Sequence, residues 1–228
     1  MNVAIITGAS QGLGLATARA LTRRGWAVAI DARREGPLRQ AAAELPDGQV
    51  AAVPGDVTDP GHRAALVTAA RALGPVTLLM NSASALGPSP QPALADYPLD
   101  ALQRVYRVNV LAPLALIQLA LPRLAAGARI LNLSSDAAVE AYEGWGGYGS
   151  SKAALEQLSA ILAIEHPGLR VYAVDPGDMN TRMHQEAFPG EDISDRPPPE
   201  DSVPGLLALV EGDVPSGRYR AAELGVRA

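Results

Sequence analysis

Short apolar runs alternate with segments of helical spacing along the whole chain. The runs are rich in Val, Ile, Ala and Leu, which suit strands that are buried on both faces of a sheet. Because such alternation implies right-handed crossovers, the sequence predicts one α/β domain over residues 1–228, with a doubly wound parallel sheet and helices on both faces. The predicted strands cover residues 3–7, 27–31, 50–54, 76–81, 129–134, 170–175 and 217–221, and the predicted helices cover 13–24, 37–44, 60–73, 99–124, 148–165 and 200–210.

This order of elements predicts where a ligand binds. In open α/β sheets, ligands lie outside the carboxyl ends of the strands. Two proline-rich stretches without periodicity, residues 86–98 and 182–199, follow strands at that edge. We interpret 182–199 as a substrate lid, with a plain surface loop as the alternative. Pro113 lies inside the longest helical run and is expected to kink that helix or end its first segment.

A glycine-rich turn follows the first predicted strand. The run from Thr7 to Gly14 reads TGASQGLG and leads directly into a predicted helix. Glycines there allow a tight turn and a close approach of the backbone to a pyrophosphate, which the helix N-terminus then stabilises. The alternative is a simple tight turn. The spacing differs from the usual dinucleotide fingerprint, because three residues separate Gly8 from Gly12.

The single lysine of the chain, Lys152, stands four residues after Tyr148. On a helix these two positions lie on the same face, so the phenol and the ammonium would share one site. A nearby cation favours the phenolate and would lower the pKa of the tyrosine towards neutral pH. Lysine suits this task better than arginine because its charge is compact and carries three rotatable donors. The alternative is an ordinary helical pair with a solvated lysine.

The glycine spacing together with Tyr148 and Lys152 resembles the short-chain dehydrogenase/reductase family over nearly the full length of the chain, and this implies a Rossmann-type fold. Further motifs match in the family's order. Asp56 resembles the aspartate that holds the adenine ring, and Pro176-Gly177 with Thr181 resembles the segment that contacts the nicotinamide amide. Asn81-Ser82-Ala83-Ser84 stands where the family usually has Asn-Asn-Ala-Gly, so its second and fourth residues depart from the pattern.

The resemblance implies a catalytic set of Asn109, Ser135, Tyr148 and Lys152. Tyr148 would exchange a proton with the reacting oxygen, Ser135 would hydrogen-bond that oxygen, and Lys152 would bind the nicotinamide ribose. Asn109 would fix a local helix distortion and anchor a proton-relay water. The implied cofactor-binding set is Gly8, Ser10, Gln11, Gly12, Leu13, Gly14, Arg33, Asp56, Val57, Asn81, Ala83, Tyr148, Lys152, Pro176, Gly177, Met179 and Thr181.

Each match also has a purely structural alternative. Asn109 could cap or interrupt a helix, Ser135 and Pro176-Gly177 could belong to turns, and Asp56 could be an N-cap. The implied activity is hydride transfer between a nicotinamide and a carbonyl/alcohol pair. Two other functions stay open: a cofactor-binding sensor or scaffold without turnover, and epimerase or dehydratase chemistry, which the short stretch after Pro176 disfavours.

The end of the second predicted strand bears on the choice of cofactor. An acidic residue there accepts hydrogen bonds from the ribose 2′-hydroxyl of NAD, whereas an arginine accommodates the 2′-phosphate of NADP. In the family's register Ala32 takes the acidic position and Arg33 takes the position of the NADP arginine. Asp31 comes one residue early and is expected to face the other side of the sheet. Gln11 argues the other way, because many NADP-preferring members place a base there; we favour NADP(H) over NAD(H).

The substrate is only broadly constrained. A small or medium carbonyl or alcohol is expected, with the pocket lined by Ser84, Ala137, Trp145, Met179, Met183 and Phe188. Trp145 is expected either to form a flat apolar wall or simply to pack beneath its loop. His184, Glu186 and Asp192 do not form a convincing metal site, so no metal is predicted.

Composition narrows the classes of partner and the compartment. The net charge is −5 with dispersed arginines, which argues against nucleic acid. The chain has no cysteine, no apolar window of the length of a membrane span and no charged leader, so we expect a cytoplasmic protein with no membrane partner. The family resemblance implies a homodimer or homotetramer. The apolar residues of the predicted helix 148–165 agree with burial on two faces, either in an oligomer or deep within one subunit.

Overall fold

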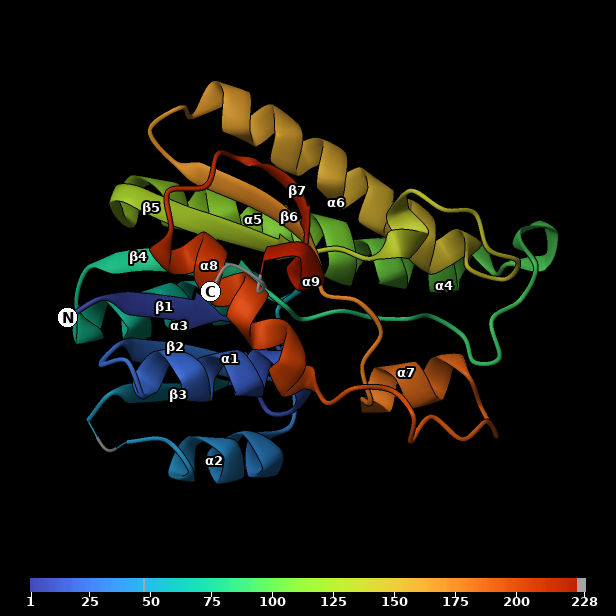
Figure 1. Cartoon of the computed structure of the whole chain (residues 1–228), viewed down its shortest axis with the longest axis horizontal. Coiled ribbons are helices and arrows are strands. Elements are labelled where there is room, and N and C mark those ends of the chain that lie inside the picture. The colour runs from blue at the N-terminus through green and yellow to red at the C-terminus, as the bar shows by residue number, and fades with distance from the viewer. Residues whose placement is uncertain (47, 225–228) are drawn as a thin grey trace.

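Seven parallel strands form one sheet with helices on both faces, which confirms the predicted fold class (Figure 1). The computed structural model describes residues 1–46 and 48–224; residues 47 and 225–228 of the predicted domain lie outside the described part. The strand order is β3-β2-β1-β4-β5-β6-β7, and each neighbouring pair is parallel. The strands are β1 (Val3–Ile6), β2 (Ala27–Ala32), β3 (Val50–Pro54), β4 (Val76–Asn81), β5 (Leu124–Leu133), β6 (Arg170–Asp175) and β7 (Gly217–Arg220).

The helices fill the connections between the strands. The order of strands reverses between β1 and β4, and this reversal is where such folds form a ligand crevice. The helices are α1 (Gly12–Thr22), α2 (Glu35–Ala43), α3 (Pro60–Leu73), α4 (Leu99–Tyr106), α5 (Ala112–Ala120), α6 (Gly146–Glu165), α7 (Arg182–Ala187), α8 (Val203–Glu211) and α9 (Ala221–Leu224), with short helical turns η1 (Leu94–Asp96), η2 (Arg107–Leu111), η3 (Leu121–Arg123), η4 (Asp136–Ala138) and η5 (Pro199–Ser202).

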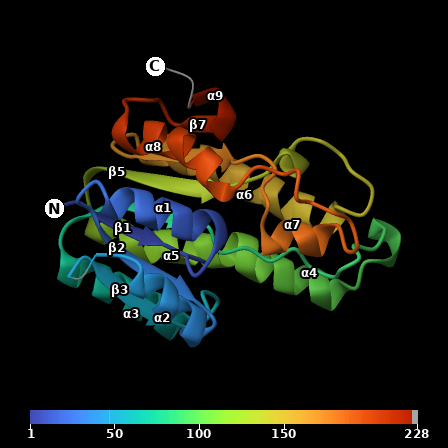
Figure 2. The ribbon, with the colours of Figure 1, turned by 60° about the horizontal axis from the view of Figure 1, so that its bottom comes forward.

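Two apolar layers attach the helices to the sheet. Ile6 of β1 packs with α1 and α8 on one face, and its neighbour Ile5 packs with α3 and α5 on the other. Both isoleucines are fully buried, as the two-residue period of a strand covered on both faces requires. Figure 2 shows α1 and α8 on one side of the strands and α3 and α5 on the other.

The longest helical run continues past Pro113, so its first segment does not end there, but the run is distorted just before this proline. α4 leads into α5 through the π-helical turn η2, in which Ala112 N donates to the carbonyl of Arg107 five residues earlier. Pro113 follows this turn in the first turn of α5, where its missing N–H is tolerated. Asn109 lies inside η2, which confirms that it stands at a local distortion of the helix.

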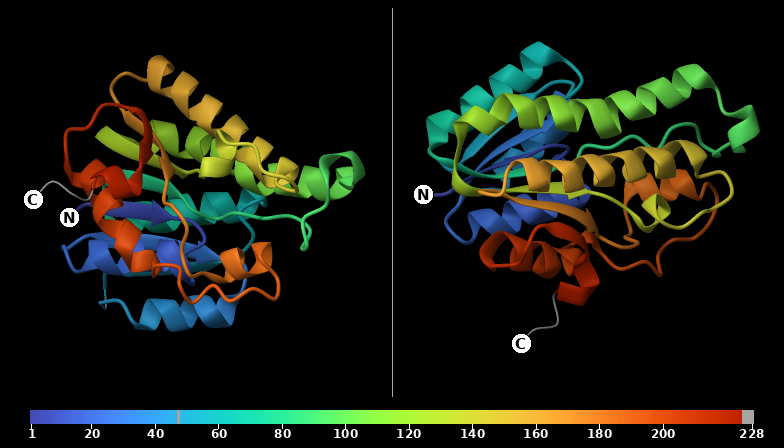
Figure 3. Two further views of the ribbon diagram at one scale, coloured as in Figure 1. Left: turned by 45° about the vertical axis from the view of Figure 1, so that its right-hand side comes forward. Right: turned by 90° about the horizontal axis from the view of Figure 1, so that it is seen from above.

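The same run, Leu99–Arg123, is long and apolar enough by length and composition to cross a membrane, contrary to the sequence expectation. Its apolar residues serve the second core layer, because Leu116, Ile117 and Ala120 are buried against the sheet. The right-hand view of Figure 3 shows the run lying beside α6.

α6 is apolar on two faces, as its sequence predicts. Leu155 and Leu162 are buried, whereas Ile161 and Ile164 are 42% and 82% exposed. The alternative that α6 lies deep within a single subunit is therefore wrong. One apolar face of α6 therefore remains uncovered by residues 1–46 and 48–224.

Both proline-rich stretches contain short helices that the sequence did not predict. The stretch 86–98 includes η1, and the stretch 182–199 begins with α7, where the hydroxyl of Thr181 accepts a hydrogen bond from His184 N at 3.2 Å. The two stretches are joined by a hydrogen bond of 2.6 Å from Ser89 Oγ to the carbonyl of Glu186. α7 lies beyond the carboxyl ends of the strands (Figures 1 and 2).

Candidate active site

A cavity of about 780 Å³ opens at the carboxyl ends of the strands. Its walls come from the glycine turn, the ends of β2 to β5, the helix α6 and the segment after β6. The structure thus brings the glycine turn and the Tyr148–Lys152 pair to one cavity. The predicted cofactor residues on its wall are Gly8, Ser10, Gln11, Gly12, Leu13, Gly14, Arg33, Asp56, Val57, Ala83, Tyr148, Lys152, Pro176, Met179 and Thr181.

Four predicted residues do not line this cavity: Asn81, Asn109, Ser135 and Gly177. The amide of Asn81 is buried and donates to Asn132 Oδ1 at 2.7 Å, so it joins β4 to β5. Gly177 N donates to the side chain of Asp175 at 3.0 Å. These contacts are structural. Asn109 bonds to Ala85, which lines the cavity, and Ser135 directly follows Ser134, which also lines it.

The glycine turn is tight because neighbouring backbone leaves no space for side chains. A Cβ on Gly8, whose φ is +68°, would lie 2.8 Å from Ala83 Cα, and one on Gly14 would lie 2.9 Å from the carbonyl oxygen of Gly8. The hydroxyl of Thr7 accepts hydrogen bonds of 3.0 Å from the backbone N–H groups of Ser82 and Ala83. The turn and the end of β4 are therefore packed as one unit.

A buried pair of Asp31 and His62 supports the turn, and no local motif of the sequence predicts it. Asp31 Oδ1 accepts from Gly8 N at 2.7 Å, and Asp31 Oδ2 lies 2.9 Å from His62 Nε2. Asp31 is 2% exposed and His62 7%. Both carboxylate oxygens thus have partners within the protein. Asp31 is consequently engaged by the glycine turn and by His62, although it also lines the cavity.

Gly8→Ala should destabilise the fold by about 2 kcal/mol or more, since a left-handed backbone and a backbone clash both oppose the methyl group. Gly36→Ala is the matched control, because a Cβ there meets nothing within 4 Å. This control should be neutral or up to about 1 kcal/mol more stable. Urea unfolding measures both. Equal stabilities for the two variants would contradict the proposed packing of the turn.

Arg33 and Asp56 both line the cavity. Burial opposes ionisation of Asp56, yet hydrogen bonds from Thr58 and the positive charge of Arg33 outweigh it and hold the pKa of Asp56 below its usual value. Asp56 Oδ1 accepts from both the N–H and the hydroxyl of Thr58 at 2.8 Å. The guanidinium of Arg33, which follows β2, therefore stabilises the carboxylate of Asp56, which follows β3.

Tyr148 and Lys152 are both buried on the same face of α6. Lys152 Nζ lies 5.3 Å from the centroid of the Tyr148 ring and donates to the carbonyl of Leu133 at 2.8 Å. Burial lowers the pKa of Lys152 to about 8. The sole lysine is thus not solvated, which removes the alternative of an ordinary surface pair.

The pKa of Tyr148 moves in the direction opposite to the sequence expectation. Burial raises it, the charges of Asp136 and Asp175 raise it further, and hydrogen bonding to Ser84 and Ser135 opposes the rise. The predicted lowering of the Tyr148 pKa is therefore wrong, because the effect of burial outweighs that of the hydrogen bonds.

Ser135 stands at the end of β5 beside Asp136, a residue that the sequence analysis did not single out. Ser135 Oγ donates to Asp136 Oδ1 at 2.8 Å, and the hydroxyl of Tyr142 donates to Asp136 Oδ2 at 3.0 Å. Burial alone would raise the pKa of Asp136, but these hydrogen bonds hold it below its usual value. The ionised carboxylate of Asp136 therefore accepts the hydrogen bond of the Ser135 hydroxyl.

Arg218 of β7 fixes the backbone of the same segment. Its Nη2 donates to the carbonyl of Ser135 at 3.3 Å, and its Nε pairs with Glu156 Oε1 at 2.9 Å. Asp175 Oδ2 lies 3.6 Å from Arg218 Nη2. Arg218 was also missed, since β7 comes far later in the chain than the residues it supports.

Asn109 joins η2 to the segment after β4 and to α6. Its amide nitrogen donates to the carbonyl of Ala85 and to Ser151 Oγ, both at 2.9 Å, and its Oδ1 accepts from Ala85 N at 2.8 Å. The side chain thus positions α6 against the cavity wall.

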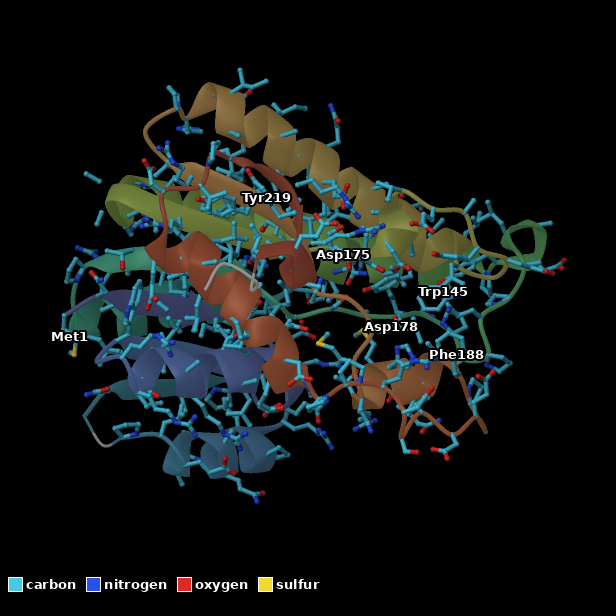
Figure 4. All side chains as sticks on the ribbon, viewed as in Figure 1. Met1, Trp145, Asp175, Asp178, Phe188 and Tyr219 are labelled. Carbon is cyan, nitrogen blue, oxygen red and sulfur yellow. The ribbon has the colours of Figure 1, made fainter. Side chains whose placement is uncertain are left out.

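An aromatic group stands beside Tyr148. The centroid of the Trp145 ring lies 5.7 Å from that of Tyr148 and 5.9 Å from that of Phe188. Trp145 and Met183 also pack against a buried cluster formed by Leu86, Ala137 and Tyr148. Figure 4 shows Trp145 and Phe188 on the same side of the molecule as Asp175 and Asp178. The segment 182–199 thus touches the aromatic side of the site.

Comparison with known proteins decides the family. The model of the short chain dehydrogenase family matches residues 2–192. The chain belongs to the short-chain dehydrogenases. The 1-deoxy-11-beta-hydroxypentalenate dehydrogenase of Streptomyces arenae is 33% identical over 192 residues, which cover 79% of this chain and 68% of that protein.

Solved structures agree with the assignment. A structure from Pseudomonas syringae, assigned as a short-chain dehydrogenase, has a TM-score of 0.89 at 29% identity and covers 96% of this chain and 94% of its own. Another, from Escherichia coli CFT073 and complexed with NADPH, has a TM-score of 0.87 at 28% identity and covers 96% of each chain. The predicted family resemblance is confirmed, and this short-chain dehydrogenase belongs to a family of oxidoreductases that use NAD(P).

The residues of the cavity fit such a dinucleotide. The glycine turn leaves backbone exposed where side chains would fill the space, and Arg33 stands at one end. At the other end Lys152 uses one N–H on Leu133, so two of its three donors remain for the hydroxyls of a nicotinamide ribose.

Proposed function

We propose that this short-chain dehydrogenase is an NADP(H)-dependent oxidoreductase that interconverts a carbonyl and an alcohol. The observation that carries the proposal is the single cavity that joins Arg33 and the glycine turn to Tyr148 and Lys152. A bound nicotinamide would supply or accept the hydride. The protein's own residues would bind the cofactor, orient the substrate and move a proton at its oxygen.

Each catalytic side chain has a role that its position supports. Tyr148 gives a proton to the substrate oxygen in reduction and takes it back in oxidation. Ser135 stabilises the charge on that oxygen once its hydroxyl turns from Asp136. Lys152 holds the ribose and the orientation of Tyr148. Asn109 keeps α6 in place. The helix distortion at Asn109 would also position a water molecule that relays protons to solvent.

NADP(H) is favoured because the groups at the adenosine end are basic and the nearby carboxylate is engaged. Arg33 and Arg34 line the cavity. Asp31, the acidic residue of the same strand end, is held by Gly8 and His62. A planar guanidinium suits a 2′-phosphate, whereas the 2′-hydroxyl of NAD would need a free carboxylate.

Arg33→Ala should weaken NADPH binding about tenfold or more and leave NADH binding nearly unchanged, because only the 2′-phosphate uses the lost charge. Fluorescence titration of the reduced nicotinamide measures both affinities. Arg39→Ala is the matched control, since Arg39 is exposed and paired with Glu35 outside the cavity. Equal losses for the two cofactors, or tighter binding of NADH by the unsubstituted protein, would contradict the NADP(H) preference.

The substrate is expected to be a small or medium carbonyl compound with an apolar part. Trp145, Met183 and Phe188 offer apolar surface beside Tyr148, and the segment 182–199 that carries two of them would act as a lid. Consumption of NADPH with a panel of cyclohexanone, acetophenone, benzaldehyde and ethyl pyruvate tests this. Turnover of none of these would oppose the proposal.

The proposal extends to assembly and compartment. The exposed apolar face of α6, with Ile161 and Ile164, suits contact with a second copy of the chain in a homodimer or homotetramer. A cytoplasmic location agrees with the absence of cysteine from the sequence.

A further inference from the structure

The segment after β6 follows the wall of the cavity and carries a charged pair. Met179, Asn180 and Thr181 line the cavity, and so do Arg182 and Glu186 of α7. Arg182 Nε donates to Glu186 Oε1 at 2.7 Å, and the two side chains are 59% and 47% exposed. A guanidinium thus stands on the cavity wall beside a carboxylate of the same helix.

This guanidinium belongs to a residue that adjoins the glycine turn. Thr181, which directly precedes Arg182, reaches the turn, because a Cβ built on Gly12 would lie 3.7 Å from Thr181 Cγ2. α1 begins at Gly12. A dinucleotide places its pyrophosphate at such a helix N-terminus in a glycine-rich turn. Arg182 therefore follows a residue that contacts the expected position of the pyrophosphate.

The glycine turn itself carries no positive side chain. Residues 7–14 include neither lysine nor arginine, so the turn offers a pyrophosphate only backbone N–H groups and uncharged side chains. Among the described residues on the cavity wall, the cations are Arg33, Arg34, Lys152 and Arg182. Arg33 and Arg34 follow β2, and Lys152 lies on α6. Arg182 is the cation of this set that follows the residue in contact with Gly12.

The pair with Glu186 leaves Arg182 able to bind a phosphate. Exposed pairs four residues apart contribute little free energy, whereas a guanidinium on a phosphate is charge-assisted and frequently bidentate. The stem of an arginine is flexible, so the guanidinium can turn while the backbone stays fixed. Hydrogen bonds from His184 N to Thr181 Oγ1 at 3.2 Å and from Ser89 Oγ to the carbonyl of Glu186 at 2.6 Å hold the backbone of α7. The exchange of partners therefore requires no movement of α7.

We propose that Arg182 binds the pyrophosphate of the nicotinamide dinucleotide and exchanges Glu186 for a phosphate oxygen. Glu186 then stays at the cavity as a carboxylate that opposes the anionic cofactor. Arg182 contributes affinity for NADPH and NADH alike because both carry the pyrophosphate, whereas Arg33 would recognise the 2′-phosphate of NADPH alone. This role rests on the proposed function only for the use of a nicotinamide dinucleotide.

Fluorescence titration with NADPH and with NADH tests this role without turnover. Arg182→Gln should weaken both cofactors about tenfold, and Arg182→Lys, which keeps the charge but not the planar fork, about threefold. Glu186→Gln should tighten both about threefold, because the guanidinium no longer leaves a charged partner. Arg104→Gln is the matched control and should change neither. Arg104 forms an exposed pair with Asp100 at 2.6 Å on α4, outside the described cavity wall.

Displacement of NADPH by two fragments locates the lost contact. ADP-ribose carries the pyrophosphate without a 2′-phosphate, and 2′-AMP carries the 2′-phosphate without a pyrophosphate. Arg182→Gln should weaken ADP-ribose about tenfold and leave 2′-AMP unchanged. Unchanged binding of all four ligands, a loss for NADPH alone, or weaker 2′-AMP would overturn the role of Arg182.

Binding and turnover separate this role from the proposed function. Tight binding of a cofactor without turnover of any ketone would overturn the proposed function, and the predicted losses in Arg182→Gln would still support the role of Arg182. Turnover with a raised KM for the ketone, and unchanged cofactor affinity in Arg182→Gln, would overturn the role of Arg182 alone. Binding of neither cofactor by the unsubstituted protein would overturn both.

Discussion

Tyr148→Phe should lower kcat by about 100-fold to 10,000-fold, because the variant loses only the group that exchanges a proton with the substrate oxygen. The ring should stay in place. Tyr148 is buried, and its packing against Trp145 at 5.7 Å does not involve the hydroxyl. NADPH affinity and the free energy of unfolding should therefore change little. Steady-state kinetics, cofactor titration and urea unfolding measure the three quantities.

The matched control for this variant is Tyr219→Phe. The hydroxyl of Tyr219 donates to the carbonyl of Pro215 at 2.9 Å, on β7 and away from the cavity wall. The same oxygen is removed there, and kcat should be unchanged. Comparable rates in Tyr148→Phe and the unsubstituted protein would show that another group transfers the proton.

Lys152→Met should remove turnover, weaken NADPH binding and make the fold more stable. Lys152 is buried, with 3% of the residue exposed, and burial lowers its pKa to about 8 from the usual 10.5. A depression of this size corresponds to a cost of about 3 kcal/mol for the buried charge at neutral pH. After loss of the hydrogen bond to Leu133, a net gain in stability of about 1 to 2 kcal/mol is expected.

The gain should depend on pH in a defined window. Between the folded pKa of about 8 and the unfolded value of 10.5, the unfolded chain binds the proton of Lys152 more tightly than the folded chain. The folded protein is thus stabilised as pH rises through this range. The advantage of Lys152→Met should be full below pH 8 and shrink above it. Urea unfolding at several pH values measures the difference between the two proteins.

Lys152→Arg is the informative companion. It keeps the charge, but a guanidinium is a wide planar fork that cannot replace a compact ammonium between Tyr148 and Leu133. Turnover should be lost without any gain in stability. An active arginine variant would contradict the specific role assigned to the only lysine. A methionine variant that is less stable at every pH would contradict the buried charge.

Much of the fold follows from the sequence because buried parallel strands read as apolar runs. β3, β4 and β6 have the predicted bounds. β5 begins at Leu124, earlier than predicted. The sequence did not predict this start because the stretch Leu-Ala-Ala-Gly-Ala has low strand propensity, and it pairs with β4 through a register shift. α7 was missed because six residues cannot show a helical period, and its start depends on the cap from Thr181.

The candidate site was predictable as far as local motifs reach. The glycine turn and the Tyr148–Lys152 pair are short runs whose spacing carries the chemistry, and both lie on the cavity. The pair of Asp31 and His62 and the support of Ser135 by Arg218 join positions 31 and 83 residues apart, so only the fold reveals them. The pKa direction of Tyr148 was wrong because it depends on burial, which the motif does not encode.

Transfer of deuterium tests the central claim most directly. NADPH labelled with deuterium on the transferred position of the nicotinamide would be mixed with each ketone of the panel and the protein, with Tyr148→Phe as the blank. The account predicts an alcohol that carries deuterium on its carbinol carbon, formed by the unsubstituted protein and not by the blank. Tight NADPH binding without labelled alcohol from any ketone would contradict it and favour a cofactor-binding sensor.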